Sequence, residues 1–218
     1  MGRVSEPADV TQTRTAYDLV AADYADLLRD DLADSPYDRA MLGVFAEQVA
    51  RAGGGLVADL GCGPGRIAGY LAGLGMDVAG IDLSPGMVDV ARREHPGLRF
   101  EVASMAALPF ADGELAGALA WYSIIHTPEE RQGELFAEFA RVVRPGGLLL
   151  LAFQVGDDAV HLTHAYGHDI DLHTRRQKLE RVREHLIGAG FSATAELLRQ
   201  PVAPEKSPQG YVLARRLP

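Results

Sequence analysis

The sequence predicts an α/β fold: a doubly wound, mostly parallel sheet of seven strands with helices on both faces and an antiparallel last strand. From residue 56 onward, short apolar runs alternate with amphipathic helical segments, which is typical of a parallel sheet covered by helices. The last two apolar runs follow one another with no helix between them, which indicates an antiparallel pair at the sheet edge. The predicted strands are residues 56–60, 77–81, 98–102, 115–121, 148–154, 192–198 and 211–215.

The amino-terminal part of the chain predicts two helices that precede the sheet. Residues 1–15 are polar, lack periodicity and are expected to be disordered. Apolar residues at helical spacing then predict helices over residues 16–28 and 37–52, the second ended by three glycines. We expect residues 16–52 to form a helical cap or lid and residues 53–218 to form a ligand-binding domain. The other predicted helices are residues 66–74, 85–94, 129–142 and 175–188.

Composition limits the classes of partner. A length of 218 residues corresponds to one large domain or a domain with a small cap. A formal net charge of −9 disfavours a nucleic-acid partner, because phosphate backbones bind basic surfaces. No apolar run reaches membrane-spanning length and no signal-peptide pattern opens the chain. The single cysteine excludes an intramolecular disulfide, so we expect a cytoplasmic protein without membrane or nucleic-acid partners; homodimerisation is left open.

A glycine-rich turn follows the first predicted strand and indicates a ligand. Asp59 is followed by Gly61, Gly63 and Gly65, and glycines at these positions let a ligand lie against the backbone. The dinucleotide fingerprint would need its third glycine at position 66, which is Arg66, and a phosphate loop would need a Gly-Lys-Ser/Thr ending. The acidic residue before the glycines favours a cationic or amino group. A glycine-rich turn without a ligand is the alternative.

The second predicted strand ends at another carboxylate. Asp82 follows the glycine turn by about 20 residues, the position at which nucleotide-binding α/β folds hold a ribose diol. Both ribose hydroxyls can donate to its two oxygens. Alternatively, Asp82 and the following Ser84-Pro85 cap the next helix, a role compatible with ribose binding.

Four sequence blocks together resemble a known family. They are Asp59-Leu-Gly-Cys-Gly-Pro-Gly65, Ile81-Asp82-Leu-Ser-Pro85, Leu108-Pro109-Phe110 and Arg144-Pro-Gly-Gly147. In this order they resemble the class I S-adenosylmethionine-dependent methyltransferases, in the type 11/25 group that acts on small molecules. The resemblance implies S-adenosylmethionine as cofactor, S-adenosylhomocysteine as product, and in-line methyl transfer to an oxygen, nitrogen or carbon atom of a small-molecule acceptor.

The resemblance also implies which residues contact the cofactor. Asp59 is expected near its amino group and Asp82 on its ribose, with Ser104 and Met105 against the adenine. Ser104 replaces the aspartate common in the family, and Ala116 replaces an acidic residue of the next strand. The full expected set is Tyr24, Asp59, Gly61, Cys62, Gly63, Gly65, Asp82, Leu83, Met87, Ser104, Met105 and Trp121.

Candidate catalytic residues follow the strand over residues 115–121. His126 has a side chain suited to taking a proton from an acceptor hydroxyl, and Tyr122 can flank the substrate beside Trp121. The alternative for His126 is an inert, hydrogen-bonded position at a helix start, since methyl transfer often relies on positioning without a base. Arg14 and Tyr24 are candidates for the cofactor carboxylate, and packing on the sheet is the alternative for Tyr17 and Tyr24.

Residues 157–173 are rich in histidine and aspartate. Such composition is found in metal sites, but no closed ligand set with standard spacing is visible, so we expect no metal and a polar loop that covers the substrate. Two other functions remain open. The chain could bind S-adenosylmethionine without transferring methyl, or, less in keeping with Arg66, bind a nicotinamide dinucleotide.

Overall fold

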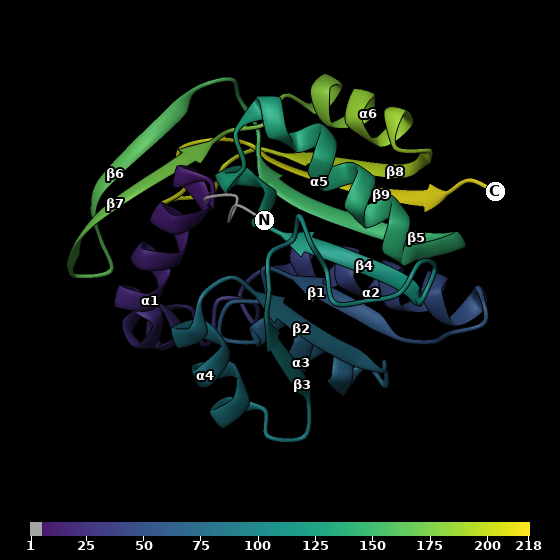
Figure 1. Cartoon of the computed structure of the whole chain (residues 1–218), viewed down its shortest axis with the longest axis horizontal. Coiled ribbons are helices and arrows are strands. Elements are labelled where there is room, and N and C mark those ends of the chain that lie inside the picture. Colours follow the sequence, from purple (N-terminus) through teal and green to yellow (C-terminus); the bar gives the residue numbers. More distant parts are fainter. Residues whose placement is uncertain (1–5) are drawn as a thin grey trace, which may run out of the picture.

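A seven-stranded sheet forms the centre of the molecule (Figure 1). The structure, a computed structural model, describes residues 6–218. The strand order is β3-β2-β1-β4-β5-β9-β8, and β9 runs antiparallel to both β5 and β8 while the other pairs are parallel. The predicted fold class is therefore confirmed. The strands are β1 (Val57–Leu60), β2 (Val78–Asp82), β3 (Arg99–Val102), β4 (Leu115–Trp121), β5 (Val143–Gln154), β8 (Phe191–Arg199) and β9 (Gln209–Arg216).

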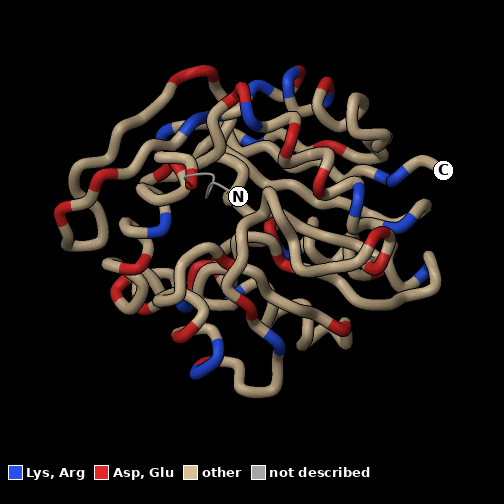
Figure 2. The backbone as a smooth tube through the Cα atoms, viewed as in Figure 1, with Lys and Arg blue, Asp and Glu red and all other residues tan. Residues whose placement is uncertain are grey.

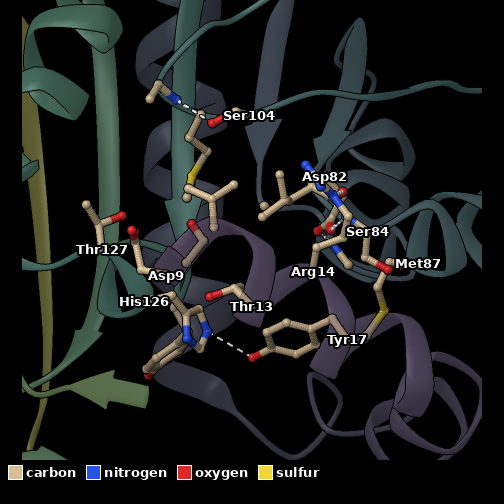
Figure 3. Close-up of a pocket in the computed structure, with 18 of the residues that line it drawn as sticks. Asp9, Thr13, Arg14, Tyr17, Asp82, Ser84, Met87, Ser104, His126 and Thr127 are labelled. Atoms are coloured by element: carbon tan, nitrogen blue, oxygen red, sulfur yellow. Dashed lines mark hydrogen bonds between the residues drawn. The ribbon is translucent and has the colours of Figure 1, made fainter. Parts of the chain in front are cut away.

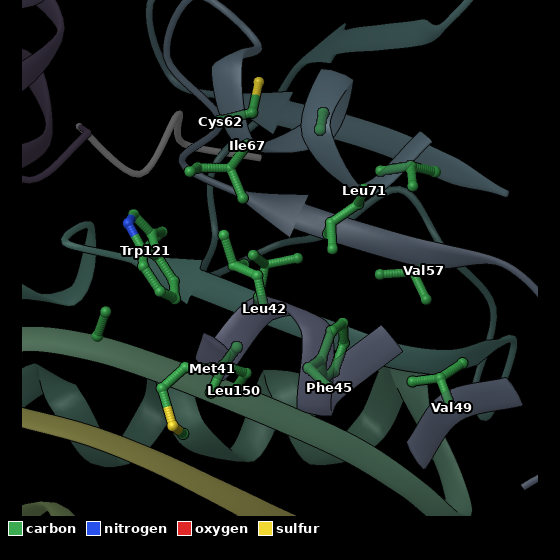
Figure 4. Packing of buried hydrophobic residues seen from close by; sticks show 14 of the residues in the cluster. Met41, Leu42, Phe45, Val49, Val57, Cys62, Ile67, Leu71, Trp121 and Leu150 are labelled. Atoms are coloured by element: carbon green, nitrogen blue, oxygen red, sulfur yellow. The ribbon is translucent and has the colours of Figure 1, made fainter. Parts of the chain in front are cut away.

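Helices cover both faces of the sheet, and each face has its own apolar core. The elements are α1 (Ala8–Leu28), α2 (Pro36–Arg51), α3 (Arg66–Gly73), α4 (Pro85–Glu94), the short turn η1 (Ile124–His126), α5 (Glu129–Val142) and α6 (Leu179–Gly188). On one face, α2 and α3 bury Leu42, Phe45 and Leu71 against the sheet (Figure 4). On the other, α5 and α6 bury Phe136, Phe139 and Leu186. Each fully buried side chain of this size contributes about 1.5–3 kcal/mol.

Helix α2 belongs to the sheet's core layer. Gly117 on β4 leaves room for it: a Cβ there would lie 3.0 Å from the Phe45 ring and 3.1 Å from Val49. The expectation that residues 16–52 form one cap is therefore wrong for α2. Of these two helices, only α1 extends over the carboxyl ends of the strands, where it packs on α4 and on strand β7 (His168–Arg175).

The helix α1 begins at Ala8, eight residues before the predicted start. The expected disorder of residues 1–15 is wrong for residues 8–15, and residues 1–5 lie outside the described part of the chain. Asp18 fixes the helix to the start of α4, because its Oδ1 accepts hydrogen bonds from Ser84 Oγ at 2.5 Å and from the Gly86 N–H at 2.9 Å. Distant contacts of this kind hold the helix in place.

Residues 157–173 form a β-hairpin rather than the expected loop. Strand β6 (Ala159–Ala165) pairs antiparallel with β7 (His168–Arg175), and the Tyr166-Gly167 turn has positive φ at both residues, as a type I′ hairpin turn requires. The side chains of Leu162, Ile170 and Leu172 pack on Ala16, Val20 and Ala21 of α1. We call α1 and this hairpin the cap; Figure 1 shows them side by side at one end of the sheet.

The two ends of the hairpin meet at a closed base. Val155 and Gln177 form a β-bridge, the Gly156 N–H donates to the Gln177 carbonyl at 3.2 Å, and the Gln177 N–H donates to the Gln154 carbonyl at 2.8 Å. The side chain of Gln132 on α5 donates to Gln177 Oε1 at 2.9 Å, and both side chains are buried. The hairpin thus leaves and rejoins the sheet domain at one point.

Charge is distributed over the whole surface. The chain has 21 lysine and arginine residues against 30 acidic ones, and Figure 2 shows the basic residues spread over many elements rather than gathered in one patch. Within residues 6–218, no helix combines the length and apolarity that crossing a membrane requires. The spread of the basic residues does not point to a surface of the kind that binds nucleic acid.

Candidate functional site

A pocket lies at the carboxyl ends of β1, β2 and β4 and is covered by α1 (Figure 3). Its empty space, counted with the open mouth, is about 910 Å³. Open α/β sheets bind ligands at this edge. Of the residues proposed for the site from the sequence, the pocket is lined by Tyr24, Gly61, Gly63, Asp82, Leu83, Met87, Ser104, Met105, Trp121, Tyr122 and His126.

The glycine turn forms the floor of the pocket. The N–H groups of Gly61 and Cys62 donate to the Ile81 carbonyl at 2.7 and 3.0 Å, which fixes the turn against β2. Gly61 has φ +74°, and a Cβ there would lie 2.4 Å from the Cβ of Ser123, so only glycine fits. Gly63 is also left-handed, and a Cβ there would sit between the Tyr24 ring and the Met87 sulfur, at 3.9 and 4.0 Å. The missing side chain leaves a gap there beside the backbone.

Asp82 is held at the end of β2 by the backbone. Its Oδ2 accepts from the Gly63 N–H at 2.7 Å and its Oδ1 accepts from the Ser84 N–H at 2.8 Å. Burial raises the pKa of this carboxyl to about 6, although these hydrogen bonds oppose the shift. Each carboxylate oxygen has a second lone pair, so the fixed carboxylate can still accept hydrogen bonds from a ligand. The N-cap of α4 is Ser84 rather than Asp82, because Ser84 Oγ accepts from the Met87 N–H at 3.0 Å.

Ser104, Met105 and Trp121 line the same pocket. Ser104 follows β3, and its Oγ accepts from the Ala106 N–H at 3.2 Å in a local turn. This leaves one lone pair of the hydroxyl for a ligand. Trp121 ends β4, is 7% exposed and packs its ring on Tyr211 at 5.7 Å between centroids.

Three residues expected at the cofactor lie behind the pocket wall. Asp59, Cys62 and Gly65 do not line the pocket. Cys62 is buried against Gly80, where a Cβ would lie 2.8 Å from its sulfur, and burial raises the pKa of its thiol. Gly65 opens α3 with φ +84°, packed against His95 and Phe100. The structure places these three residues where they support the turn, and their direct contact with the cofactor stays a prediction.

Asp59 is the most unusual of the three. It is 1% exposed, and neither carboxylate oxygen has a well-formed hydrogen bond to any residue that the structure describes. Burial raises its pKa to about 7, and the Ala68 N–H at the start of α3 offsets this only in part. The side chain lies between the turn and α3 rather than facing a ligand.

His126 faces the pocket from η1, opposite Asp82 (Figure 3). Its Nε2 lies 2.9 Å from the Tyr17 hydroxyl, and its Nδ1 lies 3.3 Å from the His173 carbonyl. Because a carbonyl can only accept, this contact assigns the proton to Nδ1 and leaves the Nε2 lone pair to accept from Tyr17. Burial lowers the pKa of the imidazole to about 4, so at neutral pH the ring is uncharged and can accept a proton.

Comparison with known proteins agrees with this geometry. Residues 57–147 match the family profile described as a methyltransferase domain. An uncharacterized methyltransferase of Mycobacterium sp. (strain JLS) is 36% identical over 120 residues, which cover 53% of this chain and 47% of that protein. A demethylmenaquinone methyltransferase of Beutenbergia cavernae is 31% identical over 152 residues, which cover 70% of this chain and 62% of that protein. The chain thus aligns with about half to three fifths of the length of these relatives.

Residues 57–147 belong to the methyltransferase-domain family. A solved structure of similar fold is the Burkholderia thailandensis 1,6-didemethyltoxoflavin-N1-methyltransferase with S-adenosylhomocysteine bound. The two share a TM-score of 0.73 and 20% sequence identity, over 100% of this chain and 93% of that one. At this identity the likeness concerns the fold.

Tyr122, the second residue expected to be catalytic, lies in the pocket wall. Its ring lines the pocket, but its hydroxyl lies 3.4 Å from the Tyr211 hydroxyl, which in turn donates to Asp38 of α2. Burial raises the pKa of Tyr122. The hydroxyl is part of a buried network between β9 and α2, and a catalytic role of Tyr122 stays a prediction.

The pocket also contains residues of α1 and α5 that sequence reasoning missed. Arg131 of α5 donates from Nη1 to both oxygens of Asp9 on α1, at 2.8 and 2.7 Å, and both residues line the pocket. Arg14, a candidate for the cofactor carboxylate, instead pairs with Glu6 at 2.5 Å and donates to the Leu83 carbonyl at 3.3 Å. No sequence signal marks Asp9, because it lies in a segment without periodicity.

Aromatic side chains hold α1 over the pocket. The Tyr17 ring makes edge contacts with Tyr24 and His126, at 5.9 and 5.2 Å between centroids, and Tyr24 contacts Tyr166 of the hairpin turn at 5.0 Å. Burial raises the pKa values of Tyr17 and Tyr24, so both hydroxyls stay protonated at neutral pH. Together with the Asp9–Arg131 pair, these contacts close the pocket on the α1 side.

Proposed function

We propose that this protein transfers the methyl group of S-adenosylmethionine to an oxygen, nitrogen or carbon atom of a small-molecule acceptor. The observation that carries the proposal is that one pocket contains both the glycine turn with Asp82 and, opposite them, His126. A cofactor along the turn would present its far end toward the imidazole.

The residues at the turn fit the cofactor. The gap at Gly63 between Tyr24 and Met87 admits a ligand against the backbone, and the unused lone pairs of Asp82 can accept two hydroxyl hydrogen bonds from a ribose. Ser104 and Met105 would lie against the adenine, with Leu83 and Trp121 completing the walls. When bound, the cofactor would supply an activated methyl group on a sulfonium centre.

The protein's own contribution is positioning and the exclusion of water. The cap closes the pocket through α1, so an acceptor would meet the cofactor in a site lined largely by apolar atoms. The proton of an acceptor hydroxyl or amine would pass to Nε2 of His126, while the His173 carbonyl holds the Nδ1–H and fixes the ring. The Tyr17 hydroxyl would first have to leave Nε2.

The first experiment is isothermal titration calorimetry of the full chain with S-adenosylmethionine, S-adenosylhomocysteine and, as a control, NAD. The proposal expects binding of the two sulfur nucleosides and no binding of NAD. NAD binding without the other two would identify a dinucleotide-binding protein instead.

The second experiment separates transfer from binding alone. The chain is incubated with S-adenosylmethionine and a panel of phenols, amines, carboxylates and enolisable carbonyl compounds, and S-adenosylhomocysteine is quantified by mass spectrometry. Acceptor-dependent product supports the transferase. Tight cofactor binding without product for any acceptor of the panel would favour a protein that only binds the cofactor.

A further inference from the structure

The outer face of the β6–β7 hairpin carries a convergent cluster of three side chains that the proposed function does not use. One ligand atom each from His161, Asp171 and His173 lies within 4.8 Å of the others. His161 Nε2 lies 2.7 Å from Asp171 Oδ1, and the rings of His161 and His173 are stacked at 4.3 Å with 10° between their planes. All three residues are exposed.

The hairpin register brings these residues together. His161 and His173 are direct cross-strand partners, and Asp171 is two residues before His173 on the same face. Cross-strand neighbours have Cβ atoms about 4.5–5.5 Å apart, a spacing from which two imidazoles can reach one ion. The opposite face of the hairpin carries Leu162 and Leu172, which pack on α1. The cluster thus has no part in packing the cap.

We propose that His161, Asp171 and His173 form a binding site for a divalent transition-metal ion of the Zn²⁺ type. Two imidazoles and one carboxylate are ligands that suit zinc, and three protein ligands leave a fourth position for water. Ligand atoms on a tetrahedral zinc lie about 3.4 Å apart. The ligand atoms of the cluster lie within 4.8 Å of one another, and rotation of the exposed side chains can bring them to this shorter spacing.

Further contacts of the three residues connect the cluster to the rest of the molecule. Gln12 of α1 and Asp171 line one surface hollow, so the cluster lies beside α1. The backbone carbonyl of His173 accepts from His126 Nδ1. An ion at the cluster therefore fixes β6 to β7 beside α1 and stabilises the strand that orients His126. The proposal does not depend on methyl transfer.

The test is calorimetric titration of ZnCl₂ into the full chain, freed of metal with a chelator that is then removed. We expect one ion per chain, with affinity at least about tenfold weaker in His161→Ala and in His173→Ala. The matched control is His164→Ala, because His164 lies on the same hairpin, is exposed and pairs with Asp169 at 2.9 Å, outside the cluster. This variant should bind zinc as the parent does.

A second readout follows the hairpin itself. Zinc should slow amide hydrogen exchange of residues 159–175 in the parent and in His164→Ala, and leave it unchanged in His161→Ala. The proposal is overturned if the double variant His161→Ala, His173→Ala binds zinc as tightly as the parent. It is equally overturned if the parent takes up no zinc.

Discussion

Asp82 combines two roles in one side chain, since it fixes the glycine turn and faces the pocket. Both oxygens accept backbone hydrogen bonds, from Gly63 and from Ser84, so the carboxylate is oriented before any ligand arrives. Such preorganisation lowers the entropic cost of binding. The turn and the second strand therefore form one recognition unit.

Replacing Asp82 with alanine should weaken S-adenosylhomocysteine binding. Hydrogen bonds to a charged group contribute about 1.5–3 kcal/mol, which corresponds to a loss of about 10- to 150-fold in affinity measured by calorimetry. Asp77→Ala is the control, because Asp77 precedes the same strand but is exposed and pairs with Arg99 on the surface. A folded Asp82→Ala protein with unchanged affinity would contradict the ribose assignment.

Asp59 predicts a pH dependence of stability. Its pKa is about 7 in the folded protein and near the ordinary 3.8 in the unfolded chain, so the folded state holds the extra proton between these values. Stability is therefore lost as the pH rises through this window. Asp59→Asn removes the buried charge. The difference in unfolding free energy between the variant and the parent should therefore shift in favour of the variant by about 3–4 kcal/mol from pH 4 to pH 8.

Urea unfolding of both proteins at the two pH values measures this difference. Asp82, whose pKa is also raised, is present in both proteins, so the comparison reports Asp59 together with its interaction with the Asp82 charge. Since Asp59 lies behind the pocket wall, the variant should keep the affinity for S-adenosylhomocysteine. A variant less stable at pH 8 than at pH 4, relative to the parent, would show that Asp59 is charged and paired in the folded protein.

At the scale of single elements, the glycine turn depends on close packing as much as on backbone conformation. Gly61 and Gly75 have similar φ values, +74° and +85°, but a Cβ at Gly75 meets no heavy atom of the described residues within 4 Å. At Gly61 it would strike Ser123, which is held by its hydrogen bond to the Leu60 carbonyl at 2.6 Å. Comparing alanine substitutions at Gly61 and Gly75 therefore separates the cost of backbone strain from the cost of steric overlap.

Gly75→Ala should cost about 1–2 kcal/mol of unfolding free energy, the penalty for a left-handed alanine. Gly61→Ala should cost about 2–5 kcal/mol, because overpacking adds about 1–3 kcal/mol. Chemical denaturation of the two variants tests the comparison. Equal losses at the two positions would mean that Ser123 moves aside at little cost.

Helix α1 is held by Asp18, which reaches the amino end of α4. Asp18→Ala removes the acceptor for Ser84 Oγ and the Gly86 N–H, so amide exchange of residues 16–28 should become faster while the sheet is unaffected. Asp26→Ala is the control on the same helix, because Asp26 is exposed and pairs only with neighbouring Arg29. Equal rates of amide exchange in the two variants would mean that apolar contacts alone hold α1 in place.

Local pattern predicted the central elements well. The bounds of β4, α4 and α5 are as predicted, because β4 is a continuous buried run and Ser84-Pro85 is a strong helix start. The start of β5 at Val143 was missed, because Arg144-Pro-Gly-Gly147 is typical of a turn, yet Val143 pairs with Leu115. Elements whose own residues show the pattern were predicted correctly, whereas the start of β5 depends on its pairing with β4.

The cap was the part of the fold that could not be predicted from the sequence. The first two turns of α1 are polar and are held by Arg131 and by the Leu83 carbonyl, partners 122 and 69 residues away. The hairpin carried a detectable signal, since Ile170 and Leu172 alternate with Asp169, Asp171 and His173, but its acidic and histidine-rich composition resembled a loop. For the site, eleven of the proposed residues line the pocket, while Asp59, Cys62 and Gly65 support it.

At the scale of the whole molecule, the cap and the sheet should differ in stability. Strands β1 and β4 are buried along their length, whereas β6 and β7 expose one face and α1 rests on a small apolar cluster. Amide exchange of the cap should therefore precede that of the central strands. On the proposed function, S-adenosylhomocysteine should slow exchange in α1, with little change in β4, as measured by mass spectrometry.

A bound ligand that protects β4 and leaves α1 unaffected would contradict this division of the molecule. It would mean that the cap does not close over the cofactor. Titrating the ligand to saturation distinguishes this from partial occupancy.

The closed base of the hairpin has a consequence for how such proteins diversify. Because Val155 and Gln177 are bridged and Gln132 holds the junction from α5, the segment between them is a cassette whose two ends are already joined. A segment of another length or sequence can be inserted between the same two residues without altering the strand order of the sheet. Selection can then exchange this cassette for another while the glycine turn and Asp82 are inherited unchanged.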